Sequence, residues 1–425
     1  MTDDQLLPDV DPEFTELLTK DLERQNSSIH LIASENFASK AVMQATGSIF
    51  TNKYAEGYPG RRYYEGCQFI DEMERLAQRR LLGLLGGVHA NVQPHSGAQA
   101  NMAVYFGLLE PGDRILGMRL DQGGHLTHGS HVNFSGKLYD FSSYGIDPET
   151  ERIDMDALRA QALEARPKIV LAGYSSYPRH LDYEAFRSIA DEVGALLMVD
   201  AAHFIGLVAG KAMPNPVDHA DIVTFTTHKA FRGARGGAII TNDEDLGLRI
   251  QKGLFPDAQG GSLYNQIAGK AVTFHEAAQP GFRVYARQVI ANAGAMADTF
   301  LERGVRLVTG GTDNHLVLVD LRSVNEDLTG KDAAKMLDSV GITLNFNAIP
   351  NDPRPPFRAS GLRIGTPAMT TQGMEEREAI EAANLLTDAL EAYGDEARLA
   401  EIEQSVRALA RRFPPYPEGF VGYPG

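Results

Sequence analysis

The sequence is poor in the residues on which several protein classes depend. It contains one cysteine, Cys67, and no tryptophan in 425 residues. A single cysteine excludes an intramolecular disulfide framework, and no Cys/His cluster has the spacing of zinc ligands. No apolar run approaches the roughly 18 residues that a membrane-spanning helix needs. We therefore expect a cytoplasmic protein with no structural metal and no membrane partner.

Positive charge is also scarce. The chain has 40 Lys and Arg residues against 56 Asp and Glu residues, a formal net charge of −16. This balance argues against a broad surface for nucleic acid or for an anionic membrane. The hydrophobic content of 43% is ordinary for a globular protein, and the length suffices for two or three domains.

Two short apolar runs in the middle of the chain end in polar residues. Ala195–Val199 is followed by Asp200 and His203, and Asp221–Phe225 is followed by TTHK, which ends at Lys229. Runs of this length are typical of strands buried on both faces of a parallel sheet. Open α/β sheets bind their ligands at the carboxyl ends of the strands, which is where these polar residues would lie.

This lysine and aspartate favour pyridoxal phosphate chemistry. A buried lysine beside a histidine is disfavoured as an ammonium ion, so it can act as a free amine and form a Schiff base. An aspartate on the next strand supplies the partner that the pyridine nitrogen of the cofactor requires. Taken singly, a lysine after a strand is usually a surface residue, and such an aspartate usually forms a turn or a helix cap. Their pairing on successive strands, followed by RGARGG, favours the chemical interpretation.

Helical patterns alternate with short apolar runs along most of the chain. Helices are expected at about 69–86, 153–165 and 183–193. This alternation predicts an α/β protein with a mainly parallel central sheet flanked by helices. A long helix at about 282–303 begins a smaller α+β domain. The predicted organisation is an N-terminal arm at 1–50, a large cofactor-binding domain at 51–280 and a small C-terminal domain at 281–425.

Three loops have compositions typical of binding sites. Ser96, Gly97 and Ala98 open a helix, whose free N–H groups attract an anion such as phosphate, although a serine there is also an ordinary cap. The loop around His125 has two further histidines, which suit either a metal or stacking on a flat cofactor. The third loop, residues 51–67, is rich in tyrosine and glycine and could be a recognition surface or could pack on the core.

The motifs, taken in order, resemble those of the serine hydroxymethyltransferase family. The resemblance runs from about residue 12 to beyond 390 and rests on LIASEN, TNKYAEGYPGRRYY, NVQPHSGAQAN, GGHLTHG, TTHK and GGTDNHLVLVDL. It implies the pyridoxal-phosphate-dependent, aspartate-aminotransferase-like fold and an obligate homodimer, or a tetramer. It also implies a role in one-carbon metabolism, the interconversion of L-serine and tetrahydrofolate with glycine and 5,10-methylenetetrahydrofolate.

The resemblance assigns cofactor-binding roles residue by residue. Lys229 would carry the cofactor, Asp200 would pair with the pyridine nitrogen, and His125 would stack on the ring. The other cofactor-binding residues would be Ser96, Gly97, Ala98, Ser175, His203 and His228, with Tyr54 and Gly261 reaching in from the neighbouring subunit.

The resemblance also assigns substrate-binding roles. Arg363 would bind the substrate carboxylate as a bidentate fork, and Glu56 would be the acid/base group. The other substrate and folate positions would be Ser34, Tyr63, Tyr64, His203, Leu120, Gly124, Leu126 and Asn347. The catalytic set would be Lys229, Glu56, Asp200, His125, His228 and Tyr64.

Several positions depart from the family's usual pattern. Phe225 stands in the threonine run, Ala234 replaces a proline, and Phe346 replaces a lysine beside Asn347. These departures leave two other activities open, an enzyme that acts on α-methylserine with D-alanine as product and an aldolase that needs no folate. A catalytically silent scaffold is a third alternative, and the retention of the lysine, the aspartate and Arg363 argues against it.

Overall fold

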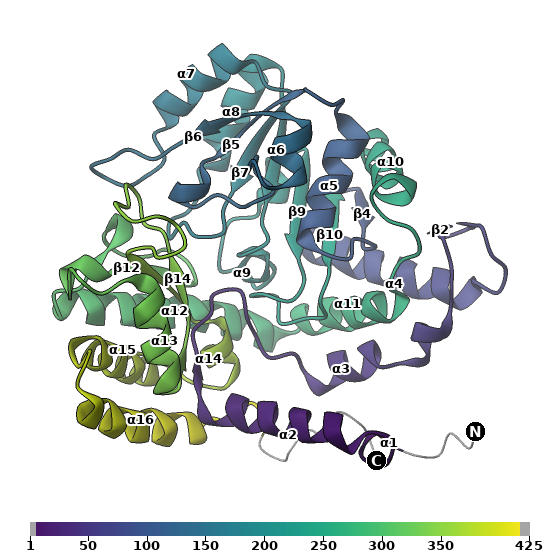
Figure 1. Ribbon diagram of the computed structural model, residues 1–425. Coiled ribbons are helices and arrows are strands. Elements are labelled where there is room, and N and C mark those ends of the chain that lie inside the picture. Colours follow the sequence, from purple (N-terminus) through teal and green to yellow (C-terminus); the bar gives the residue numbers. More distant parts are fainter. Residues whose placement is uncertain (1–5, 417–425) are drawn as a thin grey trace.

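A seven-stranded sheet forms the centre of the larger part of the molecule in the computed structural model, in which residues 6–416 are described (Figure 1). The strand order is β4-β10-β9-β8-β7-β5-β6. Neighbouring strands from β9 to β6 are parallel, whereas β10 is antiparallel to both β9 and β4. The predicted mainly parallel sheet is therefore confirmed. The strands are β4 (His89–Asn91), β5 (Arg114–Met118), β6 (Asp140–Tyr144), β7 (Ile169–Gly173), β8 (Leu196–Asp200), β9 (Ile222–Thr226) and β10 (Gly237–Thr241).

The two faces of this sheet bury alternate side chains against different helices. On β8, Leu197 and Val199 belong to one hydrophobic cluster and Met198 belongs to another. The first cluster includes apolar residues of α4 (Gln68–Leu85), α8 (Tyr183–Val193) and α11 (Tyr264–Ala277), and the second includes those of α5 (Gly97–Leu108) and α10 (Glu244–Lys252). Burial on both faces explains why these strands are continuous apolar runs.

A four-stranded antiparallel sheet lies at the centre of the smaller part, in the order β11-β12-β15-β14. Its strands are β11 (Arg306–Leu307), β12 (Leu316–Asp320), β14 (Asn345–Asn347) and β15 (Gly361–Gly365). Apolar residues of α13 (Gly330–Ser339), α15 (Glu376–Glu391) and α16 (Glu396–Arg411) complete a separate hydrophobic core.

The long helix α12 (Pro280–Glu302) joins the two cores. Phe282, Tyr285 and Val289 in its first half pack in the core of the large sheet, and Met296 and Phe300 pack in the core of the small one. The helix begins two residues before the start expected from the sequence, because Pro280 occupies its first turn, where the missing N–H group costs nothing.

Most of the N-terminal segment packs against the smaller part, whereas its last helix packs on α11 of the larger part. It consists of α1 (Leu7–Val10), α2 (Pro12–Ser27), β1 (Ile29–His30) and α3 (Lys40–Thr46), and β1 pairs in parallel with β13 (Ile342–Thr343). Ile29 and Leu31 are buried in the small core. The predicted domain boundaries at 50 and 280 stay predictions, and residues 1–5 and 417–425 of the arm and small domain lie outside the described residues.

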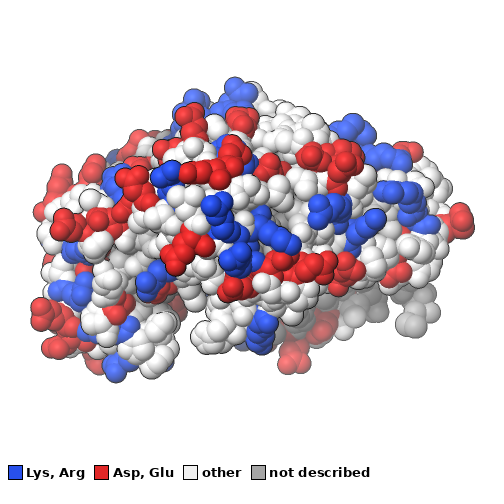
Figure 2. All heavy atoms as spheres, turned by 90° about the horizontal axis from the view of Figure 1, so that it is seen from above, with Lys and Arg blue, Asp and Glu red and all other residues white. Residues whose placement is uncertain are grey.

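Several further elements complete the fold, and its surface carries both acidic and basic side chains. Further elements of regular structure are β2 (Gly57–Tyr58), β3 (Arg61–Arg62), α6 (Phe134–Leu138), α7 (Met155–Ala165), α9 (Ile205–Ala209) and α14 (Pro367–Thr371). Acidic and basic side chains are interspersed on the face seen from above in Figure 2. Among residues 6–416, no helix is long and apolar enough to cross a membrane.

Candidate active site

Lys229 lies three residues beyond β9, in a loop that is held by the N-terminal segment. Asn36 Nδ2 donates a hydrogen bond to the carbonyl oxygen of Lys229 (3.0 Å) and another to the hydroxyl of Tyr285 (2.8 Å). No described residue forms a hydrogen bond or an ion pair with the Lys229 amine. Burial lowers the pKa of Lys229 to about 8. The carboxylate of Asp200 opposes this shift, and the guanidinium of Arg363 adds to it. The free amine is therefore far more populated near neutral pH than that of an ordinary lysine.

Asp200, the last residue of the adjacent strand β8, is buried and forms three hydrogen bonds. Its Oδ2 accepts from Asn101 Nδ2 (2.8 Å) and bonds to His128 Nε2 (3.0 Å), and its Oδ1 accepts from the backbone N–H of Ala202 (3.1 Å). Burial alone would raise the pKa of Asp200, but the bond to His128 and the other polar neighbours outweigh it and lower that pKa. The carboxylate is therefore held ionised inside the protein.

A network of uncharged groups surrounds this carboxylate. Thr127 Oγ1 lies 2.8 Å from His125 Nδ1 and accepts from Asn101 Nδ2 at the same distance, and Thr224 Oγ1 donates to Asn101 Oδ1 (2.6 Å). Burial lowers the pKa of His125 to about 4, so its ring is neutral. Sequence reasoning missed Asn101 and Thr127, although both lie inside motifs that it quoted.

The histidine loop and Asp200 place three possible metal ligands close together. His125, His128 and Asp200 offer ligand atoms that all lie within 4.8 Å of one another. However, His128 and Asp200 already bond directly, and His125 Nδ1 is occupied by Thr127. The arrangement is that of a hydrogen-bonded network that orients Asp200.

Arg363 on β15 reaches the same site from the smaller sheet. Its Nη1 donates to the carbonyl oxygen of Ser175 (2.6 Å) and its Nε donates to Asn345 Oδ1 (3.1 Å). Burial lowers the pKa of Arg363 to about 10, so the guanidinium remains charged at neutral pH. Its Nη2 has no partner among the described residues and is available to an anion.

The other predicted residues around the lysine lie between the two sheets. Ser175 Oγ donates to the carbonyl oxygen of buried Gly124 (2.8 Å), and Asn347 Nδ2 donates to Ser176 Oγ (3.3 Å). His203 stacks on His315, with Nδ1 and Nε2 3.4 Å apart, and burial lowers the pKa of both rings. Ser34 is half-buried in the segment after β1, whereas Leu120 and Leu126 are exposed.

The N-terminus of α5 has the features expected of a phosphate-binding turn. Ser96 caps the helix, and its Oγ accepts from the backbone N–H of Gln99 (3.2 Å). A Cβ atom at Gly97 would lie 2.7 Å from Thr226 Cγ2, so only glycine allows this close approach to β9. Ala98 follows in the first turn, and its N–H group has no partner within the helix.

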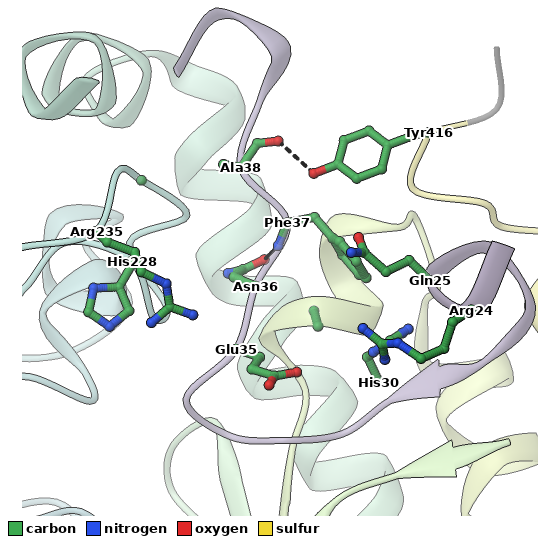
Figure 3. A pocket seen from close by; sticks show the side chains of 12 residues that line it. Arg24, Gln25, His30, Glu35, Asn36, Phe37, Ala38, His228, Arg235 and Tyr416 are labelled. Carbon is green, nitrogen blue, oxygen red and sulfur yellow. Dashed lines mark hydrogen bonds between the residues drawn. The ribbon is translucent and has the colours of Figure 1, made fainter. Parts of the chain in front are cut away.

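His228 precedes the lysine and lines a cavity beside the N-terminal segment. Burial lowers its pKa to about 3, with Arg235 and Lys229 adding to the effect. The cavity, of about 330 Å³, is lined by His228, Arg235, Glu35 and residues of the N-terminal segment (Figure 3).

The tyrosine-rich loop forms a separate, exposed cluster. Tyr54 OH donates to Glu56 Oε1 (2.9 Å), Tyr64 OH lies 3.5 Å from Glu56 Oε2, and the two tyrosine rings meet edge to face. A Cβ at Gly261 would lie 3.2 Å from the Tyr54 ring, and Tyr63 is 73% exposed. Within residues 6–416, no hydrogen bond or ion pair joins this cluster to Lys229 or Arg363, and β2 lies at the right edge of Figure 1, away from the end of β9.

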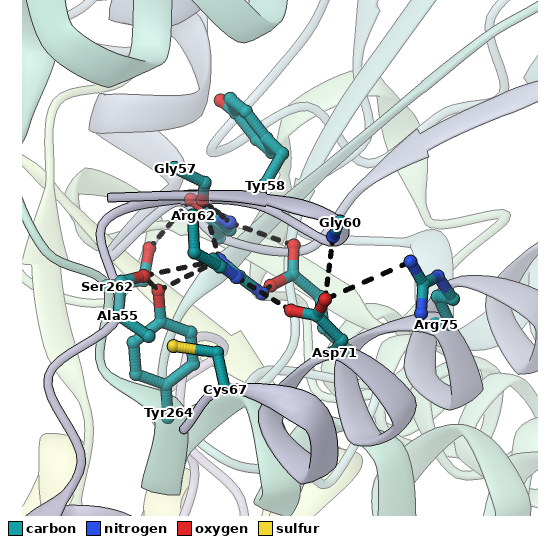
Figure 4. Close-up of polar contacts among 12 residues, drawn as sticks. Ala55, Gly57, Tyr58, Gly60, Arg62, Cys67, Asp71, Arg75, Ser262 and Tyr264 are labelled. Carbon is teal, nitrogen blue, oxygen red and sulfur yellow. Dashed lines mark hydrogen bonds and ion pairs between the residues drawn. The ribbon is translucent and has the colours of Figure 1, made fainter. Parts of the chain in front are cut away.

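A buried ion-pair network fixes the base of that loop (Figure 4). Arg62 Nη2 bonds to Glu74 (2.6 Å), its Nε bonds to Asp71 (2.8 Å), and its Nη1 donates to the carbonyl oxygen of Gly57 (2.6 Å). Gln93 Nε2 also donates to Glu74 (2.8 Å). The exposed cluster is thus carried on a rigid support.

The comparisons with known proteins agree with this geometry. The profile of the family described as serine hydroxymethyltransferase matches residues 7–386. The chain belongs to the serine hydroxymethyltransferase family. It is 54% identical over 416 residues to a serine hydroxymethyltransferase of Nostoc punctiforme, covering 98% of this chain and 97% of the relative. It is 55% identical over 422 residues to one of a Synechococcus species (97% of each chain), and 53% identical over 426 residues to one of Microcystis aeruginosa (100% and 99%).

Membership confirms the resemblance drawn from the motifs and the expected fold class. Serine hydroxymethyltransferases are pyridoxal-phosphate-dependent transferases that act on an amino acid and a folate, so the protein is an enzyme of that class. The roles of individual residues stay predictions.

Proposed function

We propose that the protein transfers the hydroxymethyl group of L-serine to tetrahydrofolate, giving glycine and 5,10-methylenetetrahydrofolate. The observation that carries this proposal is the amine of Lys229, which has no described partner and has a pKa of about 8, between buried Asp200 and the guanidinium of Arg363. These are the groups that a cofactor aldehyde, a pyridine nitrogen and a substrate carboxylate require.

The donor set around Lys229 fits pyridoxal phosphate. When bound, this cofactor supplies a sink for the electrons released at the α-carbon of the amino acid. Asp200 retains unused lone pairs on both oxygens and would hold the pyridine nitrogen protonated. The neutral ring of His125 would lie against the cofactor, and Ser96, Gly97, Ala98 and His228 would hold the phosphate, with Ser175 and His203 near the ring.

Arg363 would orient the substrate. Two of its nitrogens are fixed by Ser175 and Asn345, so the position of the guanidinium plane is set before the substrate binds. A carboxylate accepted by Nη2 would then present one chosen bond of the α-carbon for cleavage. Ser34 would assist at the same carboxylate.

We further propose that the active site is completed by a second copy of the chain. Tyr54, Glu56, Tyr63, Tyr64 and Gly261 form the exposed cluster, which the single chain leaves unconnected to its own Lys229. In a homodimer these residues would enter the neighbouring site, with Glu56 as the acid/base group. Leu120, Gly124, Leu126 and Asn347 would bind the folate from the other side.

The two departures nearest to the lysine support L-serine over α-methylserine. Thr224 and Thr226 point to the Asp200 side of β9, so Phe225 points to the opposite face, where it packs on Phe231. Ala234 is tethered by its backbone N–H to Thr273 Oγ1 (3.2 Å). The Phe225 side chain therefore faces away from Asp200, and the Cβ of Ala234 lies against Gly269 of α11.

A substrate panel tests the proposal. L-serine, α-methylserine, threonine and phenylserine are compared at equal concentrations, with and without tetrahydrofolate, and we expect the highest kcat/KM for L-serine with tetrahydrofolate. A higher value for α-methylserine would overturn the choice of substrate, and serine cleavage that is equally fast without folate would identify an aldolase. Lys229→Ala is the control for background activity.

A further inference from the structure

Lys270 is a buried lysine that the proposed function does not use. Burial lowers its pKa to about 7, the charge of Glu74 opposes that shift, and only the ammonium form can donate three hydrogen bonds from Nζ. It lies on α11 and is 1% exposed. Among the described residues, no carboxylate forms an ion pair with it. Its Nζ instead donates three hydrogen bonds to backbone carbonyl oxygens, those of Val92 (2.7 Å), Pro94 (3.0 Å) and Gly237 (2.9 Å).

The three carbonyl groups belong to the segments that shape the turn before α5. Val92 follows β4, Pro94 lies two residues before Ser96, and Gly237 begins β10. The carbonyl oxygen of Pro94 also accepts from the backbone N–H of Gly237 (3.0 Å). One ammonium group therefore joins the turn to the two strands on which it rests.

The turn before α5, β10 and the Lys270 side chain are closely packed, which leaves little room for any of them to move. A Cβ at Gly237 would lie 2.4 Å from the carbonyl oxygen of Ser96. A Cβ at Gly236 would lie 2.3 Å from Lys270 Cε, so this glycine of the RGARGG motif makes room for the lysine. The positive charge of Lys270 also acts on the proposed phosphate-binding turn, because it contributes to the lowered pKa of His228 and of His95.

We propose that Lys270 is a positioning residue for the cofactor phosphate, which it serves by fixing the Pro94–Gly97 turn and by adding a positive charge behind it. A buried ammonium without a carboxylate partner is costly, and an apolar side chain of similar length would fill the same space at less cost. The backbone N–H groups at Gly97 and Ala98 are useful to a phosphate only when the turn holds them in place. This inference rests on the proposed function, since it assumes that the cofactor phosphate binds at α5.

Comparing pyridoxal phosphate with pyridoxal tests the inference, because pyridoxal lacks the phosphate. Dissociation constants of both are measured by absorbance titration of the cofactor-free protein, for the wild type and for Lys270→Met. We expect the affinity for pyridoxal phosphate to fall at least about ten-fold, the effect of one lost charge-assisted hydrogen bond, while that for pyridoxal changes less than about three-fold. The preference for the phosphorylated form should therefore shrink.

A matched control separates positioning from stability. Asn292 is also fully buried and donates to Thr370 Oγ1 and to the carbonyl oxygen of Met374, both in the smaller part. Asn292→Ala should lower Tm and leave the preference for the phosphate unchanged. Equal losses for the two cofactor forms in Lys270→Met, or an unchanged preference, would overturn the inference.

A milder variant covers the case in which Lys270→Met does not fold. Lys270→Gln keeps an amide donor and removes the charge, and it should show an intermediate preference for pyridoxal phosphate. An unchanged preference in this variant would equally overturn the role of Lys270. A wild-type protein that binds neither form at Lys229, or that prefers neither, would instead contradict the proposed function.

Discussion

The ionisation of Lys229 gives a direct test of the site. An ordinary lysine with a pKa of 10.5 is present as the free amine in about one molecule in a thousand at pH 7.5. With the pKa of about 8 that burial produces, about a quarter of the molecules carry a free amine. Lys229 in the cofactor-free protein should therefore react with an added aldehyde about 200-fold faster than an ordinary lysine at this pH.

Reductive methylation with formaldehyde and cyanoborohydride measures this reactivity. The rate at the Lys229 peptide is followed by mass spectrometry between pH 6 and 11, and exposed lysines of the same sample serve as internal references. We expect the Lys229 rate to reach half of its maximum near the pKa of about 8.

Two substitutions should move this midpoint in opposite directions. The carboxylate of Asp200 stabilises the ammonium form, so Asp200→Asn should lower the pKa of Lys229 further. The guanidinium of Arg363 destabilises that form, so Arg363→Met should raise it. A wild-type midpoint near 10.5, or shifts of the same sign in both variants, would refute the electrostatic account.

Three further predictions concern stability and assembly. Glu74→Ala leaves the buried guanidinium of Arg62 without one of its two carboxylate partners, so the free energy of unfolding should fall by about 3–5 kcal/mol, measured by urea denaturation. Phe225→Ala should cost about 3–5 kcal/mol of stability in the same assay and leave the ratio of kcat/KM for L-serine and α-methylserine unchanged; a changed ratio would show that the residue shapes the site. Mixing inactive Tyr54→Ala with inactive Lys229→Ala subunits should restore part of the activity, because mixed dimers contain one intact site; no recovery despite subunit exchange, monitored by native mass spectrometry, would show that sites are not shared.

Much of the fold could be predicted because its signals are local. The helix expected at 183–193 is α8 (Tyr183–Val193), and the runs before Asp200 and Lys229 are the buried strands β8 and β9. The pairing of β1 with β13 could not be predicted. Each is two residues long, and no pattern within such a strand indicates a partner in a distant part of the chain.

Candidate site residues could be predicted where the residue type itself indicates a chemical role. In the structure Asp200 and Arg363 both act on the charge of Lys229, so the three residues lie in one region, while their roles stay predictions. Asn101 acts through contacts with three other segments, and its amide carries no signal in the sequence. From the sequence, Lys270 would be expected to be an exposed lysine on a helix, and only the structure shows that it is buried.

The pairing of β1 with β13 also constrains how the protein can be made. Residue 342 is translated about 310 residues after residue 29, a delay of about 15–60 s at roughly 5–20 residues per second. During that time Ile29 and Leu31 have emerged from the ribosome without the core that buries them. The first strand of the nascent chain must therefore wait in an unfolded, chaperone-accessible state. Arg363 reaches the active site only after this last core has closed, so the large sheet can form on the ribosome well before the enzyme can bind a substrate.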